Sequence, residues 1–211
     1  MVTYWVKTPQ WLKRFFPAEI IWDVLADDTP SIYLTFDDGP NPTATPFVLE
    51  TLEKYDAKAT FFCVGNNVGL YPEIYNRVVR AGHTTGNHTQ DHINGWHNTN
   101  FAYLKNIAVA AKIIESKIFR PPYGRIKISQ AKKLINAQPG WKVYMWDVLS
   151  GDFDKNISPQ QCLDNTISNM QPGSIVVFHD SEKAWDRMSY ALPKVLDHCR
   201  EKGWKIKALP K

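Results

Sequence analysis

Strand-like segments alternate with helix-like segments along most of this chain. From residue 31 onward, short runs rich in β-branched and aromatic residues are followed by longer amphipathic stretches. This alternation is typical of a parallel sheet whose strands are connected by helices, and about seven strands predict an α/β fold, a (β/α) barrel. The expected strands are residues 31–36, 59–64, 83–87, 117–119, 142–147, 174–178 and 204–208. The expected helices are residues 43–55, 71–81, 99–116, 128–137, 158–170 and 184–201.

Two adjacent aspartates, Asp37 and Asp38, end the first of these strands and precede Gly39 and Pro40. Two carboxylates side by side repel each other, and a nearby cation relieves that repulsion. The alternative is an ordinary β-turn after a strand, because Asp, Gly and Pro are all turn-forming residues. The pair therefore indicates a metal site only if other ligands lie nearby.

His88 and His92 supply candidate ligands of a second kind. With a spacing of four residues, we expect the two imidazoles to lie on one face of a helical turn, where both can bind one metal. One carboxylate from the aspartate pair would complete a set of two histidines and one carboxylate, which leaves positions open for water and substrate. The alternative is two surface histidines in a polar loop.

Three more polar sites follow the ends of expected strands. Arg120 comes after residues 118–119, Asp152 follows the strand-like residues 142–147, and His179 ends the apolar run 174–178. Separately, each has a structural explanation. Arg120 could cap a carbonyl, Asp152 could start a turn, and His179 could be a buried histidine with its hydrogen bonds satisfied. Together with the aspartates and the two histidines they make five polar sites at strand ends, which predicts a single active site at that end of a barrel.

In order and content, these five segments resemble the polysaccharide deacetylases, the NodB-homology family or carbohydrate esterase family 4. Residues 35–40, TFDDGP, match the first motif in full. The second, third and fifth motifs are matched by His88, Thr89 and His92, by Arg120, Pro122 and Tyr123, and by Val177, Phe178 and His179. The fourth motif departs from the family pattern, since Leu149 and Phe153 replace its first Asp and its Trp, although Asp152 is kept. The resemblance spans about residues 31–208.

The resemblance implies a distorted (β/α) barrel and a metal-dependent hydrolase that removes acetyl groups. One divalent metal, Zn²⁺ by expectation, would be held by Asp38, His88 and His92. The implied catalytic groups are Asp37 as general base, Arg120 as its partner, His179 as general acid and Asp152 as the partner of that histidine. The implied substrate-binding groups are Tyr123, through its backbone N–H, and the acetyl-pocket residues Phe153 and Val177.

The implied substrate is an N-acetylglucosamine unit of peptidoglycan, of a chitin-like oligomer or of another glycoconjugate. Three alternatives stay open. The first is an O-acetyl esterase, such as an acetylxylan esterase, on the same scaffold. The second is a hydrolase of a non-sugar amide or another C–N bond. The third is a catalytically inactive barrel that binds carbohydrate or a protein partner. Phe153 in place of Trp makes the sugar preference the least defined part of this prediction.

Composition limits the remaining possibilities. The chain has 211 residues, enough for one domain, and its mild net charge of +4 gives no sign of nucleic-acid binding. Three widely spaced cysteines form no disulfide framework. The sequence shows neither a signal peptide nor an apolar stretch of the roughly 18 residues needed to span a bilayer, so it predicts a cytoplasmic enzyme, with envelope association as the alternative. We expect a monomer.

Residues 1–30 precede the motifs and contain apolar residues at helical spacing, namely Trp11, Leu12, Phe15 and Phe16. We expect this N-terminal segment to close the barrel or to pack on its flank, and residues 31–211 to form the catalytic domain. A weak membrane contact through residues 9–22 is the alternative.

Overall fold

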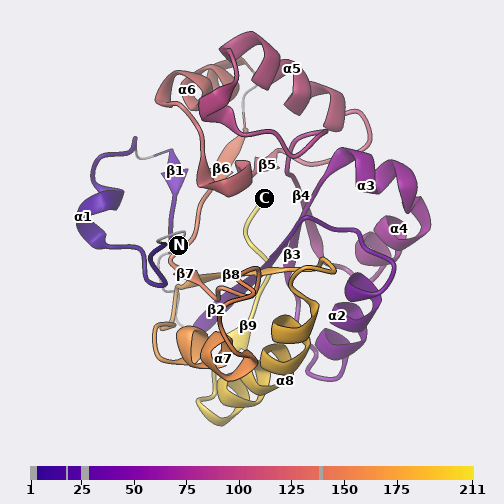
Figure 1. Ribbon diagram of the computed structural model, residues 1–211, viewed down its shortest axis with the longest axis vertical. Helices are drawn as coiled ribbons and strands as arrows, with labels where there is room; N and C mark the ends of the chain where they lie inside the picture. Colours follow the sequence, from indigo (N-terminus) through magenta and orange to yellow (C-terminus); the bar gives the residue numbers. More distant parts are fainter. Residues whose placement is uncertain (1–3, 18, 25–28, 138–139) are drawn as a thin grey trace.

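A curled parallel sheet organises the computed structural model, which describes residues 4–17, 19–24, 29–137 and 140–211 (Figure 1). Within those residues the sheet has nine strands in the order β1-β6-β5-β4-β3-β2-β8-β7, and β9 pairs with β2. Every pairing between these strands is parallel. The bounds are β1 Ile20–Ile21, β2 Ser31–Asp37, β3 Thr60–Cys63, β4 Thr84–Asn87, β5 Ile118–Phe119, β6 Lys142–Tyr144, β7 Val148–Leu149, β8 Ile175–His179 and β9 Lys205–Ile206. The prediction of a parallel α/β barrel is confirmed.

The seven predicted strands are all present, and two further strands were not predicted. The expected strand at residues 142–147 is shorter, because β6 ends at Tyr144 and the chain then forms the separate short strand β7. The other addition, β1, pairs with β6 through Ile20 and Ile21.

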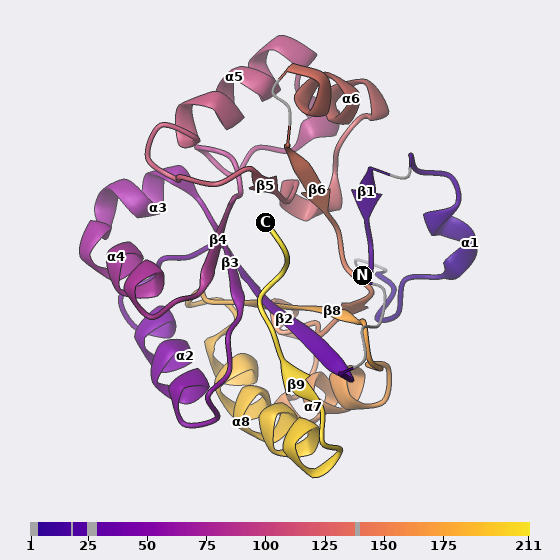
Figure 2. The same cartoon turned by 180° about the vertical axis from the view of Figure 1, so that it is seen from behind.

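Helices connect the strands and cover the outside of the sheet (Figures 1 and 2). The six predicted helices are present, and α5 ends six residues earlier than expected, where the chain turns to bury Ile114. The short helices α1 and α3 were not predicted. The bounds are α1 Gln10–Lys13, α2 Ala44–Glu53, α3 Gly65–Leu70, α4 Pro72–Arg80, α5 Asn100–Ala110, α6 Ile128–Ala137, α7 Pro159–Ile167 and α8 Trp185–Glu201. No helix among the described residues is long and apolar enough to cross a membrane.

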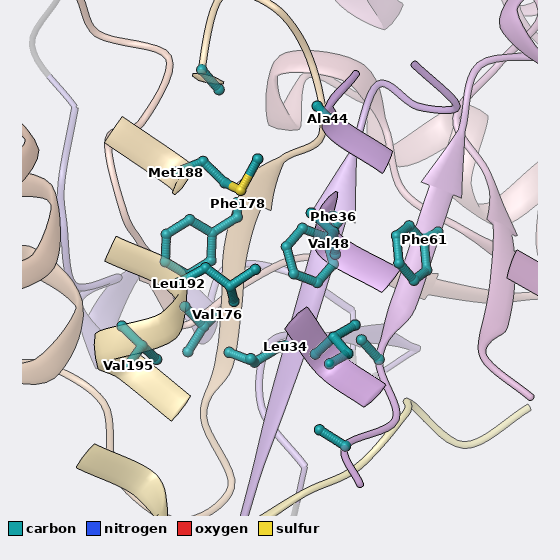
Figure 3. Packing of buried hydrophobic residues seen from close by; sticks show 14 of the residues in the cluster. Leu34, Phe36, Ala44, Val48, Phe61, Val176, Phe178, Met188, Leu192 and Val195 are labelled. Atoms are coloured by element: carbon teal, nitrogen blue, oxygen red, sulfur yellow. The ribbon is translucent and has the colours of Figure 1, made fainter. Parts of the chain in front are cut away.

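Side chains of β2 alternate between the two faces of the sheet, and this alternation separates the core from the site. Leu34 and Phe36 point outward and pack with residues of β8, α2 and α8 in the largest apolar cluster (Figure 3). Thr35 and Asp37 belong to the opposite, inner face. Since all of β2 is buried, the outer apolar layer fixes the register that carries Asp37 to the inner end of the strand.

The C-terminal residues lie in the middle of the curled sheet (Figure 2). Leu209 is buried among inner-face side chains, and its backbone N–H donates to Thr60 Oγ1 at 2.9 Å. The hydroxyl of Tyr144 donates to the carbonyl of Pro210 at 2.8 Å. These contacts fill the interior on the side of the strand N-termini.

The N-terminal segment, described at residues 4–17 and 19–24, lies between the two ends of the sheet. It pairs with β6 through β1 and forms an antiparallel bridge from Lys7 to Val148 of β7. The buried carboxylate of Asp147 holds it there, because it accepts from Lys7 Nζ at 2.5 Å and from Lys13 Nζ at 2.9 Å. The segment therefore supplies β1 at one end of the sheet and pairs with β7 at the other end.

The apolar residues of this segment do not form the longer amphipathic helix that their spacing suggested. Helix α1 has only four residues, and the rings of Trp5, Trp11 and Phe15 form an exposed edge-to-face series. A weak membrane contact through residues 9–22 stays a prediction.

Candidate active site

Asp38, His88 and His92 meet at the C-terminal end of β2 and β4. Their candidate ligand atoms all lie within 4.8 Å of one another. Asp38 Oδ1 lies 3.1 Å from His92 Nε2 and 3.8 Å from His88 Nε2. The same oxygen is buried and has no hydrogen-bond partner in the described structure. A buried carboxylate oxygen that faces two imidazole nitrogens fits a divalent cation.

Hydrogen bonds on the far side of each imidazole orient the two rings. Nδ1–H of His88 donates to the carbonyl of Arg120 at 2.8 Å, so the unprotonated Nε2 of the neutral ring faces Asp38. Nδ1 of His92 pairs with the hydroxyl of Tyr123 at 3.1 Å. Burial lowers the pKa of His88 to about 4, which keeps this imidazole neutral, as a metal ligand must be.

The Asp38 carboxyl group is held ionised by its neighbours. Burial by itself raises the pKa of Asp38, but the imidazole of His92, whose Nε2 lies 3.1 Å from Oδ1, and the charge of the His179 imidazole lower it well below its ordinary value. An acceptor that stays charged at neutral pH is what a hard or borderline divalent cation requires.

The expectation of a helical turn at residues 88–92 was wrong. This segment is a non-helical loop in which Thr89 has φ 66° and His92 has φ 54°. Both values lie in the left-handed region, which interrupts a right-handed helix. Asn87 supports the loop, because its Oδ1 accepts from the backbone N–H of Thr89 at 2.8 Å. The two rings still come together, with centroids 5.0 Å apart.

Asp37 and Arg120 form a buried ion pair beside this cluster. Arg120 Nη1 donates to Asp37 Oδ1 at 2.7 Å and to Thr35 Oγ1 at 2.7 Å. Nη2 and Nε donate to the carbonyls of Met145 and Tyr144, and the guanidinium is fully buried. Burial lowers the pKa of Arg120, and the charge of Asp37 opposes that effect. The second oxygen of the carboxylate, Asp37 Oδ2, carries no such bond and lies 4.0 Å from His88 Nε2.

A second charged pair joins His179, the last residue of the neighbouring strand β8, to Asp152 in the turn that follows β7. Register in the sheet places His179 directly beside Asp37. Asp152 Oδ1 binds Nδ1 of His179 at 2.7 Å, and Oδ2 accepts the backbone N–H of the same residue at 2.7 Å. Burial lowers the pKa of His179, but the charge and hydrogen bond of Asp152 outweigh it and raise the pKa to about 10. The imidazole is therefore a proton donor at neutral pH.

The remaining predicted residues lie beside His179 or His92. Phe153 lies against His179, edge to face, with ring centroids 5.3 Å apart. Val177 is buried one inner-face position before His179 on β8, in register with Thr35. Tyr123 is 61 % exposed, and its ring lies 4.6 Å from that of His92. The structure thus brings all ten predicted site residues into one connected cluster.

Asp180 is a site residue that sequence reasoning did not assign. Its Oδ1 accepts from the backbone N–H of Gly39 at 3.0 Å, and its Oδ2 accepts from Thr45 Oγ1 at 2.5 Å. A Cβ on Gly39 would lie 2.0 Å from Asp180 Oδ2, so only glycine fits there. Asp180 thereby fixes the turn that presents Asp38, which itself has φ 81°. Its position directly after His179 was the available signal.

Comparisons with known proteins identify the family and its relatives. The sequence model of the family described as "Polysaccharide deacetylase" matches residues 25–142. A peptidoglycan-N-acetylglucosamine deacetylase of Bacillus cereus is 31% identical over 193 residues, which cover 89% of this chain and 89% of that protein. A chitooligosaccharide deacetylase of Azorhizobium caulinodans is 32% identical over 206 residues, covering 88% of this chain and 96% of that protein. The crystal structure of the Bc1960 peptidoglycan N-acetylglucosamine deacetylase aligns with a TM-score of 0.87 at 28% identity, over 96% of this chain and 95% of that chain.

Proposed function

The chain belongs to the polysaccharide deacetylase family, and from this premise we propose that it hydrolyses the acetamido group of N-acetylated sugars, releasing acetate and a free amine. The names of the Bacillus cereus and Azorhizobium caulinodans relatives support deacetylation. The observation that carries the proposal is the arrangement of the inner face. A candidate metal cluster, a buried carboxylate and a protonated imidazole all meet at the same ends of β2, β4 and β8.

The proposed cofactor is one divalent cation, Zn²⁺ by preference, held by Asp38, His88 and His92. One oxygen and two nitrogen donors suit Zn²⁺ and leave coordination positions open. The unpaired, buried Oδ1 of Asp38 fits this role, because it otherwise lacks a partner. Bound there, the cation would polarise the acetyl carbonyl and acidify water.

Asp37 is the proposed general base. Arg120 binds its Oδ1 and holds the carboxylate in one orientation, which leaves Oδ2 to accept the proton of the attacking water. The two adjacent aspartates thus have different roles, since Asp38 faces the imidazole pair and Asp37 faces the guanidinium.

His179 is the proposed general acid. Asp152 occupies its Nδ1, so the proton available to the departing nitrogen is the one on Nε2. Hydrolysis of the amide then delivers one proton to Asp37 and one from His179 to the amine. The backbone N–H of Tyr123, whose φ of 60° turns the chain sharply after Arg120, is the proposed donor to the developing oxyanion.

Val177 and Phe153 are proposed to line the site of the acetyl methyl group. Both adjoin His179, one along β8 and the other through its ring. The proposed substrate is an N-acetylglucosamine unit of peptidoglycan, of a chitin-like oligomer or of a related glycoconjugate.

Acetate release tests this function. Purified protein, first stripped of metal and then titrated with Zn²⁺, is incubated with chitooligosaccharides, peptidoglycan fragments, acetylated xylan and simple acetamides. We expect zinc-dependent acetate and free amine from the N-acetyl sugars, and loss of both in Asp37→Asn. Activity on acetylated xylan alone would replace the amide hydrolase with an O-acetyl esterase. No release from any substrate, with metal bound, would indicate an inactive carbohydrate-binding barrel.

A further inference from the structure

A stack of three rings runs from the proposed catalytic imidazole to the N-terminal segment. His179 and Phe153 meet edge to face, with centroids 5.3 Å apart. Phe153 also meets Tyr4, with centroids 5.2 Å apart and planes tilted by 57°. Tyr4 lies outside residues 25–142, which the family model matches, and far in the sequence from every motif residue. The ring that contacts His179 is therefore itself packed against a second ring.

Contacts from three directions hold Tyr4 against Phe153. Its hydroxyl donates to Asp154 Oδ2 at 3.2 Å. The backbone next to it is anchored, because the N–H of Leu149 donates to the carbonyl of Val6 at 2.8 Å. Gly151 has φ 79°, and a Cβ there would lie 2.7 Å from Tyr4 Oη, so glycine leaves room for the hydroxyl. The ring is held in place by its surroundings and does not merely rest on the surface.

We propose that Tyr4 is a specificity-determining residue that fixes Phe153 and so limits the length of the acyl group that the enzyme accepts. This inference rests on the proposed deacetylase function. A phenylalanine ring turns about two bonds, and without a neighbour behind it the ring of Phe153 can move away from a longer acyl chain. With Tyr4 packed against Phe153, an added methylene of the acyl group must displace both rings. Tyr4 acts through Phe153 and does not itself touch the reacting atoms.

The test compares kcat/KM for N-acetyl and N-propionyl forms of the same chitooligosaccharide. One methylene in a well-formed pocket changes discrimination by roughly 10–200-fold, so wild-type protein should prefer acetyl by at least about tenfold. Tyr4→Ala should reduce that ratio by at least about fivefold, chiefly by raising the rate on the propionyl substrate. Tyr4→Phe keeps the ring and should keep the ratio.

Trp5→Ala is the matched control, because Trp5 is the adjacent aromatic residue and stacks on Trp11 instead of Phe153. It should leave the ratio unchanged. Thermal unfolding of each variant shows whether the fold is kept, and Tyr4→Leu, which keeps apolar bulk, replaces Tyr4→Ala if that variant unfolds. A general loss of structure lowers both rates together, whereas the proposed role changes their ratio.

Each other outcome has a defined meaning. An unchanged ratio in a folded Tyr4→Ala or Tyr4→Leu variant overturns the inference and leaves the deacetylase function intact. Equal wild-type rates on the acetyl and propionyl substrates also overturn the inference about Tyr4 without affecting the proposed deacetylase function. No acetate release by metal-loaded wild-type protein overturns the proposed function, and this inference with it.

Discussion

Replacing Asp152 with asparagine tests how His179 keeps its proton. The carboxylate accepts two hydrogen bonds from the same residue, one from Nδ1 and one from the backbone N–H, each at 2.7 Å. An asparagine can place its one carbonyl oxygen on only one of these donors, and its amide group then faces the other. The substitution also removes the negative charge that raises the pKa of His179.

The expected size of the effect follows from the pKa of His179. In the native protein this pKa is raised to about 10 from the ordinary 6.5, despite burial, which lowers it. Without Asp152 we expect a value near 6.5. At pH 8.5 the protonated fraction then falls from nearly all molecules to about one in a hundred, so a rate that needs this proton drops by about 100-fold. At pH 6 the drop should be several-fold at most.

The assay is a pH profile of kcat/KM for acetate release between pH 5 and pH 10.5. Asp154→Asn is the control, because Asp154 is a nearby carboxylate that binds Tyr4 and Asn156 and has no contact with His179. We expect the basic limb of the profile to move to lower pH by about three units in Asp152→Asn and to stay in place in Asp154→Asn. A basic limb that stays in place in Asp152→Asn would refute the proposed pairing of acid and carboxylate.

The same pair makes stability depend on pH. Because the pKa of His179 is higher in the folded protein than in the unfolded chain, its stabilising contribution is complete below about pH 6.5 and disappears as the pH rises through about 10. Urea unfolding of the native protein should therefore show stability falling over that window. In Asp152→Asn the dependence should be much weaker.

The other predictions concern the candidate metal ligands and the buried ion pair. His88→Ala and His92→Ala should each lose bound divalent metal together with activity, as measured by elemental analysis of purified protein, and full occupancy in both would contradict the ligand assignment. Asp38→Asn should weaken metal affinity at least tenfold, whereas Asp37→Asn should keep the metal and lose roughly 10²–10⁴-fold in turnover; similar behaviour of the two variants in both measurements would contradict their separate roles. Arg120→Met should lower the free energy of unfolding by roughly 3–5 kcal/mol, because it leaves the buried Asp37 carboxylate without its partner, and a loss under about 1 kcal/mol in urea titration would contradict that view.

Segments with a strong local pattern were predicted correctly from the sequence. β2 and β8 are buried strands rich in β-branched and aromatic residues, and their outer faces, including Phe36 and Phe178, pack under helices. Strands β1 and β7 have only two residues each and were missed, but length alone does not explain this, because β5 and β9 are equally short and were predicted. The prediction of a helical turn at residues 88–92 was wrong for another reason. Spacing alone cannot distinguish a helical turn from a loop in which left-handed residues bring two rings together.

In the candidate active site, too, some residues could be predicted from the sequence and others could not. Motif residues at strand ends could be identified from the sequence, because parallel strands bring their C-terminal ends to one edge. The contacts that support them could not. Asp180 binds Thr45 across 135 positions and Tyr4 binds Asp154 across 150, and such pairs leave no local pattern. These pairs can be identified only from the three-dimensional structure, because the curled sheet brings the partners together.

The link between Lys7 and Asp147 also has a consequence for synthesis of the protein. These partners are 140 positions apart, and at roughly 5–20 residues per second a ribosome needs on the order of ten seconds to make the chain between them. During that interval the nascent N-terminal segment, with the rings of Trp5, Trp11 and Phe15, lacks the Asp147 carboxylate that Lys7 and Lys13 both bind. The N-terminal segment is thus made long before the partner that secures it. A chain arrested before Asp147 would present this aromatic segment to chaperones, and a chain extended past Ser174, the third partner of that carboxylate, would not.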